Sequence, residues 1–207
     1  MVTWMGPFFK AIYRQLAKGL MKLGVSPNAV TITGTAGVVF GAVFWLPRGG
    51  FNLFIGTMVI TFFVFLDMVD GMMARMSGKS TRFGADLDST LDRIADAAIF
   101  GSIMWAFLDE HRPTALAAFL CLAFGSVVPY ARARAEALGV DAKVGIAARS
   151  DRLVIGLVAT GIVGVGWVPR EVLTYTLAFL AVAAFITVIQ RSWAVAKASR
   201  IDPSIPA

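Results

Sequence analysis

The sequence predicts an all-α integral membrane protein, and its composition, apolar segments and charge distribution support this fold class. The chain has 207 residues, of which 57% are hydrophobic and only 15% are charged, which is unusual for a soluble domain. Six apolar stretches are each about long enough to cross a bilayer, the shorter ones with help from flanking residues. We therefore expect one membrane domain over residues 1–207, with six transmembrane segments within 29–190. The stretches are 29–47, 51–74, 85–108, 114–131, 153–168 and 172–190.

The region before the first stretch, residues 3–23, predicts an amphipathic helix of a different kind. Its basic residues recur every four positions, and apolar residues supply surface near the opposing face. Such a helix lies in the membrane interface, with its lysines facing anionic headgroups. The alternative is an amphipathic helix packed on a core, and the six membrane segments that follow favour the interfacial position. The basic residues are Lys10, Arg14, Lys18 and Lys22, and the apolar residues are Phe9, Ile12, Tyr13, Leu16, Leu20 and Leu23.

Basic residues are distributed unevenly between the two ends of the six stretches. Three turns rich in proline and glycine carry only Arg48, Arg112 and Arg170, whereas fifteen basic residues lie on the opposite side. The positive-inside rule therefore predicts a multi-pass protein of the cell membrane whose termini and 75–84 loop are cytoplasmic. This pattern also explains the net charge of +6, so we expect membrane lipid, and not nucleic acid, as a partner. The fifteen are Lys10, Arg14, Lys18, Lys22, Arg75, Lys79, Arg82, Arg132, Arg134, Lys143, Arg149, Arg152, Arg191, Lys197 and Arg200.

The chain has a single cysteine, Cys121, and a single histidine, His111. One cysteine excludes an intramolecular disulfide framework and a cysteine-based metal site. The histidine lies in a short polar run that predicts a loop, which argues against catalysis by imidazole. The amino terminus lacks the compact apolar core and small-residue cleavage site of a signal peptide, so we expect none to be removed.

Four carboxylates lie at the facing ends of the second and third stretches. Asp67 and Asp70 are spaced i,i+3, and Asp88 and Asp92 are spaced i,i+4, so each pair shares one face of a helix. Ionised groups beside long apolar segments are costly and mark functional sites. Two antiparallel helices joined by a short turn would bring the four acids together at the cytoplasmic edge. A hard divalent cation such as Mg²⁺ would relieve their repulsion and bind substrate phosphates.

The carboxylates belong to a longer pattern, D-x2-D-G-x2-A-R-x8-G-x3-D-x3-D, which the chain matches without a gap. The pattern resembles the signature of the CDP-alcohol phosphotransferases, integral membrane enzymes of phospholipid synthesis. The alternative, a pair of salt-bridged helix ends, would need no fixed glycine and alanine between its acids. The eight defined positions are Asp67, Asp70, Gly71, Ala74, Arg75, Gly84, Asp88 and Asp92.

The resemblance implies a reaction in which a CDP-linked donor gives its phosphatidyl group to an alcohol and CMP leaves. It implies two metal ions, Mg²⁺ or alternatively Mn²⁺, that bridge the pyrophosphate, with Asp67, Asp70 and Asp88 as the principal ligands. Asp92 would be the general base that takes the acceptor's proton, and it would also contact a metal. The family further suggests a homodimer.

The same resemblance implies a site for the cytidine donor. Gly71, Ala74 and Gly84 would make room for the nucleotide, although small residues also serve ordinary helix packing. The order P-N-x-x-T before the first stretch recurs in the family, and it is also compatible with a simple helix start capped by Ser26 or Asn28. The predicted donor-binding residues are Pro27, Asn28, Thr31, Asp67, Gly71, Ala74, Arg75, Arg82 and Gly84.

Arginines gather after the fourth stretch and at the end of the last one. The pattern Y-x-[KR]-A-R-A-E-A followed by R-x-x-R-L resembles bacterial phosphatidylinositol-phosphate synthases, which implies a pocket for inositol phosphate. A positive loop that meets anionic lipid is the alternative. Asp96 continues the i+4 row of acids, and we expect it to pair with Arg93 or with a basic residue on another helix. The predicted acceptor residues are Arg132, where a lysine is commoner, and Arg134, Arg149, Arg152 and Arg191.

The sequence therefore predicts a phosphatidyltransferase that uses CDP-diacylglycerol and inositol 3-phosphate and yields phosphatidylinositol phosphate and CMP. Glycerol 3-phosphate is the alternative acceptor, because it is also a phosphate ester. A divalent-cation transporter is the alternative of a different class, but it would more naturally place broken helices and acids near the bilayer midplane.

Overall fold

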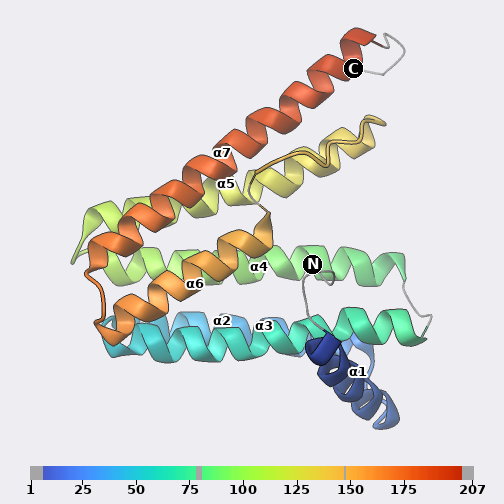
Figure 1. The fold of residues 1–207 in the computed structure, drawn as a ribbon, viewed down its shortest axis with the longest axis horizontal. Coiled ribbons are helices and arrows are strands. Elements are labelled where there is room, and N and C mark those ends of the chain that lie inside the picture. Colours follow the sequence, from blue (N-terminus) through green and yellow to red (C-terminus); the bar gives the residue numbers. More distant parts are fainter. Residues whose placement is uncertain (1–6, 78–80, 147, 202–207) are drawn as a thin grey trace.

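The computed structural model describes residues 7–77, 81–146 and 148–201, and every regular element in these ranges is helical. Six long helices follow a shorter amino-terminal one, in agreement with the predicted order of elements (Figure 1). The elements are α1 (Pro7–Lys22), α2 (Pro27–Trp45), the 3-10 turn η1 (Leu46–Arg48), α3 (Phe51–Ser77), α4 (Arg82–Phe107), α5 (Arg112–Ala137), α6 (Arg149–Val165) and α7 (Arg170–Ile201).

Local signals in the sequence explain where these helices begin and end. Ser26 caps α2 by accepting a hydrogen bond from the amide of Ala29 at 3.2 Å, and Pro27 occupies the first turn. Thr81 caps α4 in the same way, through the amide of Gly84 at 2.9 Å. Gly166 ends α6 in the left-handed conformation, with a φ of 80°, which favours glycine.

At the end of the bundle where α3, α5 and α7 finish, these helices extend beyond the apolar stretches that the sequence predicts. For example, α5 continues to Ala137 and α7 to Ile201, whereas the corresponding apolar stretches end at 131 and 190. The continuations contain alanine, arginine and glutamate, which favour helix without requiring burial in lipid. Figure 1 shows α5 and α7 side by side, diverging together from the other helices toward this end.

Two packing units hold the bundle together. The main core joins residues from α2 to α7, including the fully buried Ile60, Ile103 and Leu177. Each of α3 and α4 packs along α2 more than against the other, so they are not the simple paired hairpin that the sequence suggested. Helix α2 therefore sets the distance between the two helices that carry the acids.

Helix α1 packs against α3 through a smaller core. Tyr13 and Ala17 are buried there, together with Val69 and Met73 of α3. The apolar face is thus divided, because Tyr13 contacts the protein while Ile12, Leu16 and Leu23 remain exposed. Arg14, Lys18 and Lys22 are exposed beyond the packed face. The amphipathic helix is confirmed as a helix, but one of its faces serves tertiary packing.

Four of the described helical segments are long and apolar enough to cross a membrane: Pro27–Arg48, Phe51–Ser77, Arg112–Ala137 and Arg170–Arg200. The other two expected spans differ in composition and length. Helix α4 contains several acids and arginines, and α6 has only 17 residues. The structure is therefore that of a helical membrane protein with four clear candidate spans, rather than six that are equally evident.

Candidate metal and nucleotide site

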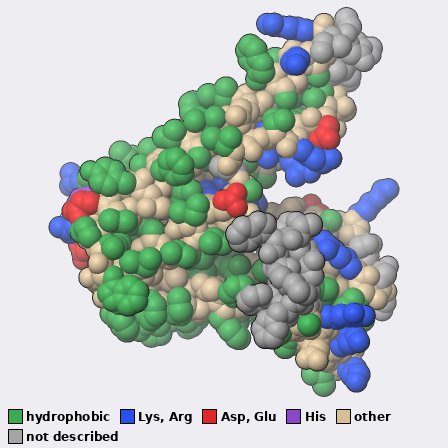
Figure 2. Space-filling view, in the orientation of Figure 1, with side chains coloured by type: hydrophobic (Ala, Val, Ile, Leu, Met, Phe, Trp, Pro, Cys, Tyr) green, Lys and Arg blue, Asp and Glu red, His purple; other side chains and the backbone are tan. Residues whose placement is uncertain are grey.

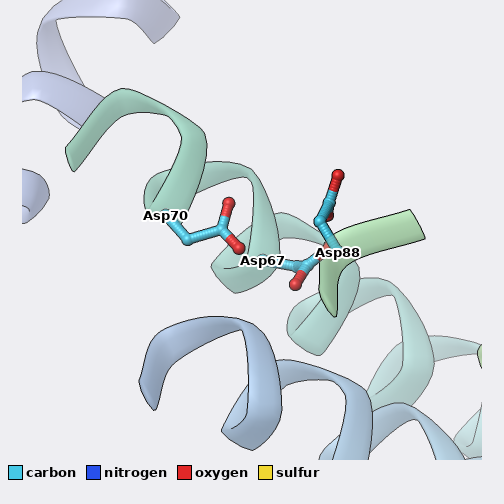
Figure 3. Close-up of side chains that lie close together, drawn as sticks. All are labelled: Asp67, Asp70 and Asp88. Carbon is cyan, nitrogen blue, oxygen red and sulfur yellow. The ribbon is translucent and has the colours of Figure 1, made fainter. Parts of the chain in front are cut away.

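Three of the four predicted acids come together in space. Asp67 and Asp70 project from α3 and Asp88 from α4, and one carboxylate oxygen of each lies within 4.8 Å of the others (Figure 3). Asp67 and Asp70 are partly buried, whereas Asp88 is exposed. The buried Oδ1 of Asp67 has no hydrogen-bond partner among the described residues. Three carboxylates that include an unpaired buried oxygen fit a hard divalent cation, because such ions prefer oxygen ligands.

Helix α2 fixes the positions of the two acids on α3. The Thr31 hydroxyl donates a hydrogen bond to the Asp70 carboxylate. One turn later, a Cβ atom added at Gly34 would lie only 3.3 Å from Asp67 Cβ and Oδ1. Gly34 therefore permits a close approach of α2 to Asp67, which a larger side chain would crowd.

A cavity of about 240 Å³ lies beside the carboxylates, between the first turns of α2 and α4 and the last turns of α3. Of the nine predicted donor-binding residues, seven line it; Asp67 and Arg82 do not. The sequence analysis missed Thr81 and Ala85, although the cap three residues before Gly84 is a local signal for Thr81. The full lining is Pro27, Asn28, Thr31, Asp70, Gly71, Ala74, Arg75, Thr81, Gly84, Ala85 and Asp88.

The small residues of the motif have two different roles. A Cβ atom added at Gly71 would meet nothing within 4 Å, so this glycine does not serve helix packing and instead leaves the cavity open. At Gly84 the same atom would lie 3.2 Å from Asn28 Oδ1 and from Thr81 Oγ1. Gly84 therefore permits close approach of α4 to the start of α2.

Asp92 lies one helical turn beyond Asp88 and is held by an arginine. Arg149 Nη1 lies 2.7 Å from Asp92 Oδ1, and Arg149 Nη2 donates to the Asp92 carbonyl at 3.2 Å. The group of three acids that could share one cation does not include Asp92. The structure thus places the predicted base beside the cluster but in an ion pair of its own.

Asp96 forms the ion pairs that the sequence led us to expect. Its carboxylate accepts from Arg149 Nε at 3.0 Å and from Arg152 Nη2 at 2.7 Å, and Arg93 Nη1 lies 3.7 Å away. Arg152 is only 1% exposed. A buried arginine needs a paired carboxylate to offset the loss of hydration, so Asp96 and Arg152 form the fixed centre of this network.

The five predicted acceptor arginines occupy three different environments. Arg149 and Arg152 belong to the network with Asp92 and Asp96, whereas Arg132 pairs with Glu136 on the surface of α5 and Arg134 is exposed on the same helix. Arg191 donates to the backbone carbonyls of Val128 and Val144 and so ties α7 to α5 and to the following loop.

Figure 2 shows Lys and Arg side chains on the arm formed by α5 and α7, beside the hollow that separates this arm from the other helices. Residues 138–146, which follow α5, lie along this arm (Figure 1). Lys143 holds the pKa of the exposed Asp141 carboxyl below its usual value, because its ammonium group donates a hydrogen bond of 3.0 Å. Asp141 and Lys143 therefore neutralise each other, so the excess positive charge of this face comes from the arginines.

An apolar groove of about 570 Å³ runs between α3 and α6. Phe54, Phe65 and Trp167 are among its lining residues. Its lining also includes Met68 and Leu153, which follow Asp67 and Arg152 directly in the sequence. The groove thus begins beside the polar site and continues along the hydrophobic helices.

Comparisons with known proteins identify the family of this chain. A model of the family "CDP-alcohol phosphatidyltransferase" matches residues 24–189. A phosphatidylinositol phosphate synthase of Streptomyces avermitilis is 46% identical over 191 residues, which cover 89% of this chain and 78% of the relative.

Two crystal structures of the Mycobacterium tuberculosis phosphatidylinositol phosphate synthase, each 41% identical, have the same fold. The one with CDP-DAG bound has a TM-score of 0.82 and covers 89% of this chain and 94% of that one. The one in complex with manganese and citrate has a TM-score of 0.81 and covers 88% of each chain. These matches favour the transferase over a cation transporter. The chain is an enzyme that belongs to the CDP-alcohol phosphatidyltransferase family.

Proposed function

We propose that this enzyme transfers the phosphatidyl group of CDP-diacylglycerol to inositol 3-phosphate and releases CMP. The observation that carries the proposal is the Asp67–Asp70–Asp88 cluster, which opens beside a cavity lined by most of the predicted donor residues. The names of the relatives, phosphatidylinositol phosphate synthases at 41–46% identity, support the choice of acceptor.

Asp67, Asp70 and Asp88 would hold the divalent cations, which we propose to be two Mg²⁺ ions that Mn²⁺ can replace. Bound there, the cations would neutralise the donor pyrophosphate and the leaving CMP. The acceptor hydroxyl oxygen forms a bond to the phosphorus of the phosphatidyl group, and the bond from that phosphorus to the CMP oxygen breaks. Asp92 accepts the hydroxyl proton. Asp92 would also reach a metal once its ion pair with Arg149 opens.

The nucleotide of the donor would occupy the cavity between α2, α3 and α4. Gly71 and Ala74 leave space for a flat ring, and Arg75 supplies a cation for a donor phosphate. Arg82 would act from the edge, since it does not line the cavity. The acyl chains of the donor would occupy the groove between α3 and α6, because that groove begins beside the acids and is lined by apolar side chains.

For the acceptor phosphate we propose the face that carries Arg132, Arg134, Arg149, Arg152 and Arg191. Arg134 is the most available of these cations, because Arg132 pairs with Glu136, Arg149 and Arg152 pair with acids of α4, and Arg191 holds two backbone carbonyls. A phosphate ester matches the forked geometry of arginine. A neutral alcohol such as inositol would leave the excess of basic side chains on this face less explained.

The purified enzyme in detergent, supplied with CDP-diacylglycerol, Mg²⁺ and one acceptor at a time, tests this assignment. Mass analysis of the lipid product should find phosphatidylinositol phosphate with inositol 3-phosphate and little product with inositol or serine. Efficient use of glycerol 3-phosphate together with no use of inositol 3-phosphate would replace the proposed acceptor while leaving the transferase chemistry intact.

A substitution at Gly71 tests the nucleotide cavity. We expect Gly71→Ala to weaken CDP-diacylglycerol binding about tenfold, because the new methyl group enters the open cavity. The matched control is Gly101→Ala on α4, where a Cβ atom also meets nothing within 4 Å but no donor residue is near. Both variants should keep the melting temperature, as measured by thermal unfolding, and equal donor affinities would contradict the assignment.

We further propose that α4 and α6 complete six transmembrane segments, with α1 in the interface and both termini and the active site at the cytoplasmic side. Both helices pack within the bundle among the four clear spans, and Asp96 of α4 pairs with Arg149 and Arg152 of α6 inside it. On α1, exposed Ile12, Leu16 and Leu23 would enter lipid beside the basic residues.

We also propose that the enzyme is a homodimer, as the family resemblance suggests. Chemical cross-linking in membranes would detect the dimer.

Cysteine labelling checks this orientation. In a Cys121→Ala background, a cysteine at Lys143 should react with an impermeant maleimide only from the cytoplasmic side, and one at Arg112 only from outside. Both native side chains are exposed at opposite ends of the bundle, so access should not limit the reaction. Lys79, which the same argument places in the cytoplasm, lies outside the described residues. The reversed labelling pattern would overturn the topology.

A further inference from the structure

A second apolar groove, called here the α2–α4 groove, lies between these two helices and shares no lining residue with the groove between α3 and α6. Its volume is about 640 Å³. Its lining includes the exposed side chains of Phe40 and Ile94, the buried Thr35 and the half-buried Leu91. The surface between α2 and α4 is therefore recessed, and most of the recess is apolar.

The α2–α4 groove follows almost the whole length of α2. Its lining residues run from Ile32, which adjoins Thr31 of the donor cavity, to Arg48 in η1. At ~1.5 Å per residue this length is roughly 24 Å, most of a hydrocarbon core that is about 30 Å thick. Because Pro27–Arg48 is one of the four clear candidate spans, this long recess lies beside lipid, and an acyl chain matches its shape.

Arg48 supplies a positive charge at one end of the α2–α4 groove. Its side chain is exposed, and its Cζ lies 3.9 Å from the centroid of the Phe44 ring, one turn earlier in the chain. This contact holds the guanidinium beside a side chain of the groove. Arg48 forms no ion pair with any residue of 7–77, 81–146 or 148–201, so its N–H donors are available to an anion at the end of the groove.

The position of this charge determines which way a bound lipid would lie. The groove between α3 and α6 begins beside the acids, and none of its described lining residues is charged. In the α2–α4 groove the one charged residue of the described lining, Arg48, lies at the end of α2 opposite the donor cavity. A phosphate held by Arg48 would therefore belong to a lipid of the leaflet opposite the active site.

We propose that the α2–α4 groove binds a phospholipid of this opposite leaflet, with its headgroup phosphate on Arg48 and one acyl chain along Phe44 and Phe40. The fork of the guanidinium matches phosphate oxygens through paired hydrogen bonds. Since α2 and α4 also line the donor cavity at their other ends, the lipid would hold together two helices that form the active site. Lipid binding here is independent of which acceptor the enzyme uses.

Arg48→Gln tests the phosphate contact, with Arg112→Gln as the matched control. Arg112 is also exposed and lies at the same end of the bundle, but it does not line the groove. Native mass spectrometry of the purified enzyme in detergent measures the affinity for phosphatidylglycerol. We expect Arg48→Gln to weaken this affinity about tenfold, because a charge-assisted contact is lost, and Arg112→Gln to keep the wild-type value. Equal affinities in the two variants would contradict the proposal.

Diacylglycerol with the same acyl chains separates the headgroup from the chains. It lacks the phosphate, so the wild type should bind it about tenfold more weakly than phosphatidylglycerol, whereas Arg48→Gln should bind both lipids alike. Equal binding of the two lipids by the wild type would show that the groove is only an apolar surface, and it would overturn the phosphate site.

Ala36→Phe tests the site of the acyl chain. Ala36 is exposed and lines the groove, so a phenylalanine there would fill the recess without entering the core. Phosphatidylglycerol should raise the melting temperature of the wild type and of Arg112→Gln, because a ligand that binds the folded state stabilises it. It should not raise that of Arg48→Gln or Ala36→Phe. An equal rise in all four proteins would place the lipid elsewhere.

A photoreactive side chain identifies what covers the groove in a bilayer. Benzoylphenylalanine in place of Val43, which is exposed and lines the groove, should cross-link to phosphatidylglycerol in nanodiscs, and the yield should fall when Arg48→Gln is added. The same group in place of Phe179, an exposed residue of α7 outside the groove, gives the yield for unspecific lipid contact. A yield at Val43 no higher than at Phe179 would overturn the proposal, as would cross-links at Val43 that join two copies of the chain.

Discussion

Asp70→Asn should reduce CMP release from CDP-diacylglycerol by about a thousandfold, because a bound cation contributes several kcal/mol to the transition state and each ~1.4 kcal/mol is worth tenfold in rate. Asparagine keeps the size of the side chain but removes the charge that would hold the metal. Asp67→Asn and Asp88→Asn should have effects of the same order, since the three oxygens share one space. The rate is measured at saturating Mg²⁺ with CDP-diacylglycerol and inositol 3-phosphate.

Asp86→Asn is the matched control for this series. Asp86 is also an exposed aspartate of α4, two residues before Asp88, but it does not belong to the cluster. Its substitution should leave the rate within about twofold of the wild type, because isolated surface charges contribute little. Mn²⁺ binding should weaken in the three cluster variants and stay unchanged in Asp86→Asn. Equal losses in all four variants would show that the cluster has no special role.

Asp92→Asn should lower turnover by about a hundred- to ten-thousandfold, the range that a general base contributes. In contrast to the cluster variants, it should retain most of its affinity for Mn²⁺ and for CDP-diacylglycerol. The structural reason is that Asp92 contacts Arg149 and lies outside the group formed by the other three acids.

Binding and turnover must be measured on the same preparation of Asp92→Asn. Equilibrium binding of Mn²⁺ and of the donor gives the first part, and single-turnover CMP formation gives the second. A near-normal rate would exclude Asp92 as an essential base. A loss of Mn²⁺ binding as large as that of Asp70→Asn would instead make Asp92 a principal metal ligand.

Much of the site could be predicted because its geometry is local in sequence. Asp67 with Asp70, and Asp88 with Asp92, share helix faces by simple periodicity. The same holds for Asn28 and Thr31, which follow a capped helix start and line the cavity. Where spacing along one helix decides which residues are neighbours, the sequence alone is informative.

The polar network behind Asp92 could be predicted only in part. Asp96 was expected to pair with a basic residue, but its partners Arg149 and Arg152 are 53 and 56 residues away. Packing of α6 against α3 and α7 determines that these arginines lie beside Asp96. The spacing of residues along a single helix cannot predict such a contact. For the same reason the sequence grouped five arginines that the fold distributes over three environments.

The boundaries of the helices and the position of α1 were harder to predict. Hydropathy ends where apolar residues end, whereas α5 and α7 continue as helices of alanine and charged residues. In α1, Tyr13 belongs to the apolar pattern, yet it packs against α3 while Leu16 on the neighbouring face is exposed. A surface for lipid and a surface for protein have the same composition, so only the tertiary structure separates them.

The central claim is that three aspartates from two helices bind the metal that drives CMP release from CDP-diacylglycerol. The most direct measurement is CMP formation by the purified enzyme with inositol 3-phosphate, first in EDTA and then after addition of excess Mg²⁺ or Mn²⁺. We predict no turnover in EDTA, full recovery with either ion, and no recovery in Asp70→Asn. Full turnover in metal-free buffer, or recovery of Asp70→Asn to the wild-type rate, would contradict the account.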